Sequence, residues 1–434
     1  MKGWILNGHQ HSLVNKFILC LKKFAFIKIA LNTIICMKKI SFKFVFLLTL
    51  LGSISAYSFF YTSKLVRTPL FLIQDILSVD TGEVVKDKIV SKKNKVSWVD
   101  SVFAMMTPDE RIGQLFMVAA YSNKDRAHKN EIAELVKKYK IGGLIFFQGG
   151  PLRQANLTNY YQSLATIPLF VAIDGEWGLA MRLDSTQMYP KQMTLGAIQD
   201  DRLIYDMGAQ IANECRRIGM QINFAPVVDI NSNPLNPVIG FRSFGENKYD
   251  VASKGLMYMK GMQDRQVLAC GKHFPGHGDT DADSHKALPV INHSKERMDT
   301  LELFPFKILI EQGLKSMMVA HINIPAYDTL KKSAASISKN VVSDLLKDSL
   351  QFKGLIFTDA LNMKGVSANY KPGFVDVKAL LAGNDVLLFS EDVPVAIQEI
   401  KNAIDSCLIT QEDIDIRCKK ILEQKEWVKD TMHQ

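Results

Sequence analysis

The chain alternates short apolar segments with amphipathic ones from residue 95 onward. Strands that are apolar throughout and alternate with helices indicate a parallel sheet covered on both faces. The apolar, β-rich runs are Gln114–Ala120, Gly143–Phe147, Pro168–Asp174, Ile222–Asp229, Val267–His273, Ser316–Ile322, Leu355–Asp359 and Asp385–Phe389. The segments with a 3.6-residue apolar period include Glu131–Tyr139, Asp201–Ile218, Val251–Asp264, Lys295–Glu311, Asn340–Leu350 and a closing segment, Gln411–Val428.

Eight strand–helix units predict an α/β fold, a (β/α)8 barrel of the TIM type with loop insertions. An open, doubly wound sheet is the alternative, because counting strands does not separate the two. No Gly-x-Gly-x-x-Gly follows the first run, which weakens a dinucleotide-binding version of that alternative. We expect one catalytic domain over residues 95–430, a linker over 63–94 and a leader over 1–62.

The leader carries the basic charge of the chain. Residues 1–74 hold nine Lys, one Arg and no acidic residue, whereas the remainder has 43 basic and 44 acidic residues. The globular part therefore gives no charge argument for nucleic acid, and we expect no nucleic-acid partner. Four of the six cysteines lie in the globular part, and none forms a CxxC or zinc-like cluster, so buried small side chains are favoured.

An uncharged run of 19 residues, 44–62, follows Lys43 in the leader. A basic segment before an apolar one predicts a signal peptide, or a membrane anchor, which needs about 20 residues. Lysines before the run place the globular part on the exported side of the membrane, periplasmic or anchored facing it. We expect the start at Met37, and the alternative is a second membrane segment within residues 1–36, which its lysines make costly.

Polar residues gather at the predicted carboxyl ends of the strands, where barrels of this kind place their chemistry. The densest segment is Lys272–His285, which holds three histidines and three aspartates among Pro and Gly. One interpretation is a metal site using His273, His277 and His285, although zinc motifs of that spacing normally lie on a helix. The other is acid–base chemistry, with Asp283 orienting His285 and stabilising its imidazolium.

Asp359 follows the seventh apolar run and is the candidate nucleophile. A carboxylate there is costly to bury unless it is paired or functional, and carboxylates attack anomeric carbons to form a covalent glycosyl-enzyme. A helix N-cap is the alternative role for Asp359. We expect no cofactor and no resident metal.

The segments KHFPGHGDTDADSH (272–285) and FTDALNMKGV (357–366) resemble glycoside hydrolase family 3, and more narrowly its β-N-acetylhexosaminidase branch. IDGEWGLAMR, NFAPVVD and IGFRSFG are also similar to that family. The resemblance runs from roughly residue 95 to 425. It implies a (β/α)8 barrel and retaining removal of a terminal β-linked N-acetylglucosamine, with peptidoglycan fragments (muropeptides) as the expected source.

The resemblance also implies the roles of individual residues. Asp359 matches the nucleophile, His285 the general acid/base and Asp283 its partner. The residues that match sugar-binding positions are Asp174, Arg182, Arg242, Lys272 and His273. A histidine that acts as a base is neutral and adds no second negative charge near an anionic acceptor. We therefore further expect that phosphate, as well as water, can accept the sugar.

The chain departs from the family pattern at two points. The motif after the third strand is usually Asp-Gln-Glu-Gly-Gly-Arg, and here Trp177 stands at the first Gly and Leu179 at the Arg. We expect this change to affect which leaving group is preferred and not the reaction itself. Trp177 either offers a ring near the sugar or packs in the loop. Many relatives carry a further domain after the barrel, so we expect either a single-domain form or the front of a fusion.

Two other function classes stay open from the residues alone. One is a metal-dependent hydrolase built on the histidine loop, which chelators would inhibit. The other is a catalytically silent sugar-binding module, against which the presence of Asp359, Asp283 and His285 together argues.

Overall fold

The computed structural model describes residues 97–284, 287–330, 333–368 and 370–429 of the chain. The leader, with the proposed anchor 44–62, and His285 lie outside the described residues. Among the residues described, no helix is both long enough and apolar enough to cross a bilayer.

A parallel sheet of eight strands forms the centre of the described part of the chain. The first seven strands pair in sequence order, each with the next, and the first strand also pairs with the last. A bridge from Phe357 to Val386 joins the two remaining edges, so the sheet closes. The strands are β1 (Phe116–Tyr121), β2 (Gly143–Phe147), β3 (Phe170–Ile173), β4 (Ile222–Asn223), β5 (Leu268–Phe274), β6 (Ser316–Val319), β7 (Leu355–Thr358) and β8 (Leu387–Leu388).

This sequential order with closure is that of the predicted (β/α)8 barrel, and it excludes the open sheet, in which the strand order reverses. All eight predicted strands are present. Two are much shorter than predicted, β4 and β8. The run after β4 contains Pro226, which has no N–H to donate to a ladder, and pairing resumes only as a bridge between Val227 and Lys272.

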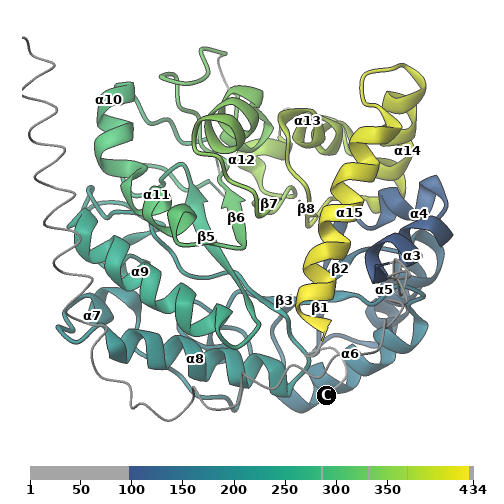
Figure 1. Cartoon of the computed structure of the whole chain (residues 1–434), viewed down its shortest axis with the longest axis horizontal. Coiled ribbons are helices and arrows are strands. Elements are labelled where there is room, and N and C mark those ends of the chain that lie inside the picture. Colours follow the sequence, from purple (N-terminus) through teal and green to yellow (C-terminus); the bar gives the residue numbers. More distant parts are fainter. Residues whose placement is uncertain (1–96, 285–286, 331–332, 369, 430–434) are drawn as a thin grey trace, which may run out of the picture. The chain divides into compact units, whose positions relative to one another are not determined.

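Helices lie outside the strands, and α8 and α9 run side by side along the part of the barrel that carries β4 and β5 (Figure 1). The α-helices are α3 (Trp98–Met105), α4 (Pro108–Gly113), α5 (Arg126–Tyr139), α6 (Pro151–Leu164), α7 (Gln192–Gly196), α8 (Arg202–Arg217), α9 (Lys248–Gln263), α10 (Lys295–Arg297), α11 (Phe304–Glu311), α12 (Lys364–Ser367), α13 (Phe374–Ala382), α14 (Val393–Asp405) and α15 (Gln411–Trp427). The segment predicted as one helix over 295–311 is divided by a π-helical turn, Met298–Glu302, and Asn340–Ser349 is π-helical as well.

Local sequence signals explain where several helices begin. Thr107 and Glu110 form a reciprocal capping box before α4, with Pro108 in its first turn, and Thr410 and Asp413 do the same before α15. The strands between the helices are buried throughout, as in β3 and β6, because helices cover one face and the barrel interior the other. This packing fixes the carboxyl ends of the strands at one end of the barrel.

Side chains complete the seam between β7 and β8, where the ladder is short. The Thr358 hydroxyl oxygen accepts from the Leu388 N–H at 3.0 Å, and the Asp385 carboxylate accepts from the Ile356 N–H at 2.9 Å. Asp385 is buried and also binds Lys420 Nζ at 2.6 Å. The barrel is therefore closed partly by carboxylate and hydroxyl groups.

We predict that Asp385→Ala destabilises the protein by about 2–4 kcal/mol, because it leaves a buried N–H unsatisfied and removes the partner of Lys420. Urea unfolding measures the change. Asp405→Ala, an exposed acidic residue in the last turn of α14, is the control and should stay within about 0.5 kcal/mol of the parent. An equal effect of the two substitutions would contradict the role given to Asp385.

Candidate active site

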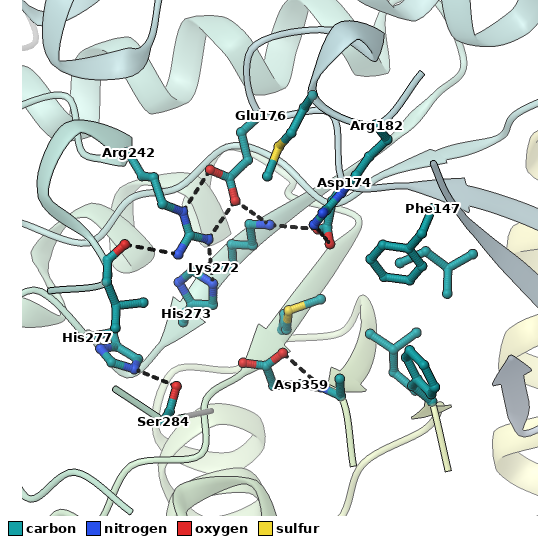
Figure 2. A pocket seen from close by; sticks show the side chains of 17 residues that line it. Phe147, Asp174, Glu176, Arg182, Arg242, Lys272, His273, His277, Ser284 and Asp359 are labelled. Carbon is teal, nitrogen blue, oxygen red and sulfur yellow. Dashed lines mark hydrogen bonds and ion pairs between the residues drawn. The ribbon is translucent and has the colours of Figure 1, made fainter. Parts of the chain in front are cut away.

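A buried ion network lies at the carboxyl ends of β3 and β5. Lys272 Nζ donates to Asp174 Oδ1 and contacts Glu176 Oε1, both at 2.8 Å. Arg242 binds Glu176 through two nitrogens, at 2.6 and 2.9 Å, and Arg182 donates to Asp174 at 2.9 Å. Three cations thus share two carboxylates in one connected network (Figure 2).

The groups of this network are ionised. Burial by itself raises the pKa of Glu176, but Arg242 and Lys272 outweigh it and hold that pKa well below its ordinary value. Burial likewise raises the pKa of Asp174, but the positive charges of Lys272 and Arg182 outweigh it and hold that pKa below its ordinary value. Burial favours a neutral Lys272, yet its two carboxylate partners raise its pKa above the ordinary value. The network therefore presents fixed charge to the space beside it.

His273 connects this network to a second buried carboxylate, Asp229. Its Nδ1 lies 2.7 Å from Asp229 Oδ2, and its Nε2 lies 3.2 Å from Arg242 Nη2. A guanidinium only donates, so Nε2 accepts and the ring proton resides on Nδ1, where it is donated to Asp229. Asp229 also accepts from the backbone N–H groups of His273 and His277. The ring orientation and tautomer of His273 are therefore fixed.

Asp359 lies directly after β7 and faces the network across an open space (Figure 2). Its Oδ1 accepts from the Ala360 N–H at 2.8 Å, and His321 Nε2 donates to the Ala360 carbonyl at 3.0 Å. Burial raises the pKa of Asp359, but the imidazoles of His321 and His273 and the Ala360 N–H outweigh it, so the pKa lies below the ordinary 3.8. The side chain is ionised at neutral pH and is only partly covered.

The histidine loop after β5 is packed closely against its surroundings. A Cβ at Gly278 would lie 1.7 Å from the Ile230 carbonyl oxygen, so only Gly fits there. His277 is buried between Thr280, 2.9 Å from its Nδ1, and Ser284, 3.2 Å from its Nε2. Burial, with His273 nearby, lowers the pKa of His277 to about 4, so this ring is neutral at pH 7.

The loop carries Asp283 and Ser284 immediately before His285. Asp283 is half-buried, and its backbone carbonyl accepts from the Ala287 N–H at 3.0 Å. Because His285 itself is outside the described residues, its pairing with Asp283 stays a prediction.

A cavity of about 270 Å³ lies between these groups. This volume is near the lower limit of roughly 300 Å³ for small-molecule pockets, so it suits one small ligand or one unit of a larger chain. The polar residues that line it are Asp174, Glu176, Arg182, Arg242, Lys272, His273, His277, Ser284 and Asp359. The apolar residues that line it are Ile145, Phe147, Met181, Val238, Met318, Ala360, Leu388 and Phe389.

The cavity therefore brings together six of the eight residues predicted to be catalytic or sugar-binding: Asp174, Arg182, Arg242, Lys272, His273 and Asp359. Sequence reasoning missed the anchoring role of Asp229 and left the role of Glu176 open. Both are carboxylates that follow an apolar run, which is the signal that could have selected them. The apolar residues that line the cavity could not be selected from the sequence, because they look like ordinary core residues.

The rings of His273 and His277 do not favour a metal site in the loop after β5. Both ring nitrogens of His273 and of His277 are already engaged by protein groups. Among the described residues, the one group of three metal-ligand types that converges is Asp279, His293 and Glu302. There Arg297 lies 3.4 Å from Glu302 Oε1 and 3.9 Å from Asp279 Oδ2, so a cation of the chain itself already occupies the cluster.

The model of the "Glycosyl hydrolase family 3 N terminal domain" matches residues 107–424. The chain belongs to glycosyl hydrolase family 3. A β-hexosaminidase A from Pseudoalteromonas piscicida is 34% identical over 331 residues, which are 68% of this chain and 55% of that protein. A β-hexosaminidase from Thiobacillus denitrificans is 35% identical over 260 residues, 57% of this chain and 71% of that protein.

Among solved structures, a family 3 β-N-acetylglucosaminidase from Paenibacillus sp. is similar, with a TM-score of 0.71 and 37% identity. The similarity covers 75% of this chain and 63% of that one. The chain thus spans little more than half the length of the first of these curated relatives. The family membership and the barrel agree with the expectations drawn from the sequence.

We predict that Glu176→Gln lowers the free energy of unfolding by about 3 kcal/mol at pH 7, because two buried cations lose a carboxylate partner. The folded pKa of Glu176 is depressed, so its contribution is present above the unfolded value of 4.5 and is lost as the pH falls below it. The difference between parent and variant should therefore shrink in acid, as measured by urea unfolding at pH 7 and pH 3.

Asp184→Asn is the matched control for Glu176→Gln. Asp184 also pairs with an arginine, Arg153, at 2.9 Å, but both partners are more than half exposed. Exposed pairs contribute at most about 1 kcal/mol. A loss for Glu176→Gln no larger than for Asp184→Asn would contradict the buried-network interpretation.

Proposed function

We propose that the chain is a retaining, exo-acting glycosidase that removes a terminal β-linked N-acetylglucosamine. The observation that carries this proposal is an ionised carboxylate, Asp359, facing a buried ion network across a cavity sized for one unit of a chain. Both curated relatives described above are named β-hexosaminidases, and the similar solved structure is named a β-N-acetylglucosaminidase, which supports this sugar.

In this proposal the ion network binds the hydroxyl groups of the sugar. Asp174, Lys272 and Arg182 offer both acceptors and donors at one end of the cavity. Hydrogen bonds to charged groups are the strong ones, and they discriminate best where water is excluded. His273 helps to position the network, because its ring is held by Asp229 and accepts from Arg242.

The proposed reaction has two steps. The Asp359 carboxylate attacks the anomeric carbon, the bond to the leaving-group oxygen breaks, and His285 donates the proton that this oxygen takes up. Water then attacks the anomeric carbon, the bond to Asp359 breaks, and neutral His285 accepts the proton of the water. Asp283 orients His285 in both steps. The low pKa of Asp359 keeps it ionised for the attack.

The proposed natural substrates are peptidoglycan fragments, that is, muropeptides with a terminal N-acetylglucosamine. Chitin oligomers are the alternative source of the same terminal sugar. A phosphate acceptor in the second step, giving a sugar 1-phosphate, is the further alternative that a neutral base allows. No resident metal is part of the proposal.

For location, we propose that residues 44–62 direct export and that the barrel faces the periplasm or the exterior. The basic residues before this run and its 19 uncharged residues support the proposal.

We predict that the full chain hydrolyses 4-nitrophenyl β-N-acetylglucosaminide and that Asp359→Ala lowers kcat/KM at least a hundredfold, roughly, because no other carboxylate replaces the nucleophile. Chelators should leave the activity unchanged. A chelator-sensitive activity would favour the metal-dependent hydrolase, and saturable sugar binding without turnover would favour the binding module.

His285→Ala should lose roughly 10²- to 10⁴-fold on a disaccharide, because general acid catalysis contributes that much to expulsion of a poor leaving group. With a 2,4-dinitrophenyl leaving group, which needs no proton, the first step should be nearly unaffected. Burst kinetics separate the two steps. Equal losses on both substrates would rule out His285 as the acid.

Deleting residues 44–62 should retain the protein in the cytoplasm, because the apolar segment that enters the export machinery is gone. Cell fractionation with an activity assay measures this. If the deleted protein reaches the same compartment as the parent, the leader has been assigned wrongly.

A further inference from the structure

The peptide units on both sides of Asp359 are held by the neighbouring strands. The Asp359 N–H donates to the Val319 carbonyl, and the Leu361 N–H donates to the Leu388 carbonyl, both at 2.9 Å. Val319 ends β6 and Leu388 ends β8, the two strands that flank β7. Two backbone hydrogen bonds, one to each neighbouring strand, thus hold the segment that carries the proposed nucleophile.

His321, which lies two residues after β6, adds a third contact to this segment. Its Nε2 lies 3.0 Å from the carbonyl oxygen of Ala360. That carbonyl belongs to the same peptide unit as the Leu361 N–H, and the Ala360 N–H is the donor to Asp359 Oδ1 at 2.8 Å. The imidazole therefore fixes the residue that in turn holds the carboxylate.

Ser336 sets the ring orientation of His321. A carbonyl oxygen only accepts, so Nε2 of His321 carries a proton, and Nδ1 of the neutral ring accepts from the Ser336 hydroxyl at 2.7 Å. Ser336 is itself fixed, because its N–H donates to the Ala320 carbonyl at 3.1 Å and its carbonyl accepts from Asn384 Nδ2 at 2.7 Å. Both His321 and Ser336 are fully buried. The N–H of the ring is thereby aimed at the Ala360 carbonyl.

His321 acts on the site from outside the cavity. The described residues that line the cavity include Asp359 and Ala360 but not His321. Both ring nitrogens of His321 are engaged by protein groups. A side chain placed in this way acts on the reaction through the residue that it holds.

We propose that His321 and Ser336 are positioning residues of the nucleophile, which fix Ala360 so that Asp359 reaches the anomeric carbon. This inference rests on the proposed function and adds two residues to it. Attack requires the reacting atoms to lie roughly 3–3.5 Å apart, and a misplacement of about 1 Å costs about a hundredfold in rate. Without the imidazole, the Ala360 carbonyl loses a partner, and the N–H that holds the carboxylate is less firmly placed.

The test separates placement of the nucleophile from binding of the sugar. We measure the first step of the full chain by single-turnover kinetics with 2,4-dinitrophenyl β-N-acetylglucosaminide, and the Kd of N-acetylglucosamine by titration. His321→Phe, which keeps a ring and removes the donor, should slow the first step roughly ten- to hundredfold. The Kd of N-acetylglucosamine should stay close to that of the parent, because the ion network is intact.

Two milder variants keep the test informative if His321→Phe folds poorly. Ser336→Ala removes one hydrogen bond and should slow the first step roughly three- to tenfold. His321→Gln offers an amide N–H to the Ala360 carbonyl and should recover part of the rate. Combining Ser336→Ala with His321→Phe should be no slower than His321→Phe alone, because Ser336 acts through His321.

Ser316→Ala is the matched control for Ser336→Ala. Ser316 is also a fully buried serine, and its hydroxyl donates to the Ala269 carbonyl at 2.8 Å. It begins β6, at the end of the strand opposite to the active site. Its substitution removes a comparable hydrogen bond and should leave the first step unchanged.

The inference is overturned if folded His321→Phe and Ser336→Ala react as fast as the parent, or if Ser316→Ala slows the first step as much as Ser336→Ala. It is also overturned if the affinity for N-acetylglucosamine falls in parallel with the rate, since the pair would then shape the whole cavity. A parent that releases no dinitrophenolate contradicts the proposed function as well, whereas an active parent with unaffected variants contradicts only the positioning role.

Discussion

Glu176 is the residue that joins the buried ion network of the cavity to the chain segments around it. It is fully buried, its carboxylate binds Arg242 and Lys272, and its carbonyl holds Gln192. Four stretches of chain are thereby fixed relative to one another: the loop after β3, the start of α7, the turn before α9, and β5. A buried carboxylate of this kind is tolerated only because its partners are complete, and removing it takes away the carboxylate that pairs with Arg242 and leaves Lys272 with Asp174 alone. The same contacts that hold the loops thus set the charge of the site.

The fold was predictable because its signal is repeated. Each strand such as β3 or β6 is an uninterrupted apolar run, and eight such runs alternating with helices predict a barrel, whereas closure itself is shown only by the pairing of β1 with β8. Where tertiary contacts override the local pattern, prediction failed. The fourth run contains Pro226 and forms a ladder over two residues only, and the 295–311 segment breaks at a π-helical turn that propensity does not announce.

The residues of the site could be predicted from their positions at the strand ends, but the contacts between them could not. Asp174, Lys272 and Asp359 could be selected because polar residues after apolar strands of a barrel converge. The partner of each one could not be known: that Lys272 bridges two carboxylates, or that Asp229 holds His273, is decided by side-chain reach across neighbouring strands. His273 and His277, four residues apart, have different partners and different environments, which spacing alone does not reveal.

The seam between β7 and β8 lies next to Asp359 and affects how that residue is held. Asp359 follows β7, the strand whose contact with β8 is completed by the side chains of Thr358 and Asp385, whereas the ion network lies on β3 and β5, where the ladders continue into both neighbours. The two halves of the site are therefore held by different kinds of contact: side-chain hydrogen bonds complete one flank of the strand before Asp359, and backbone ladders flank the strands that carry the ion network. We expect a change at Thr358 or Asp385 to act first on the placement of Asp359.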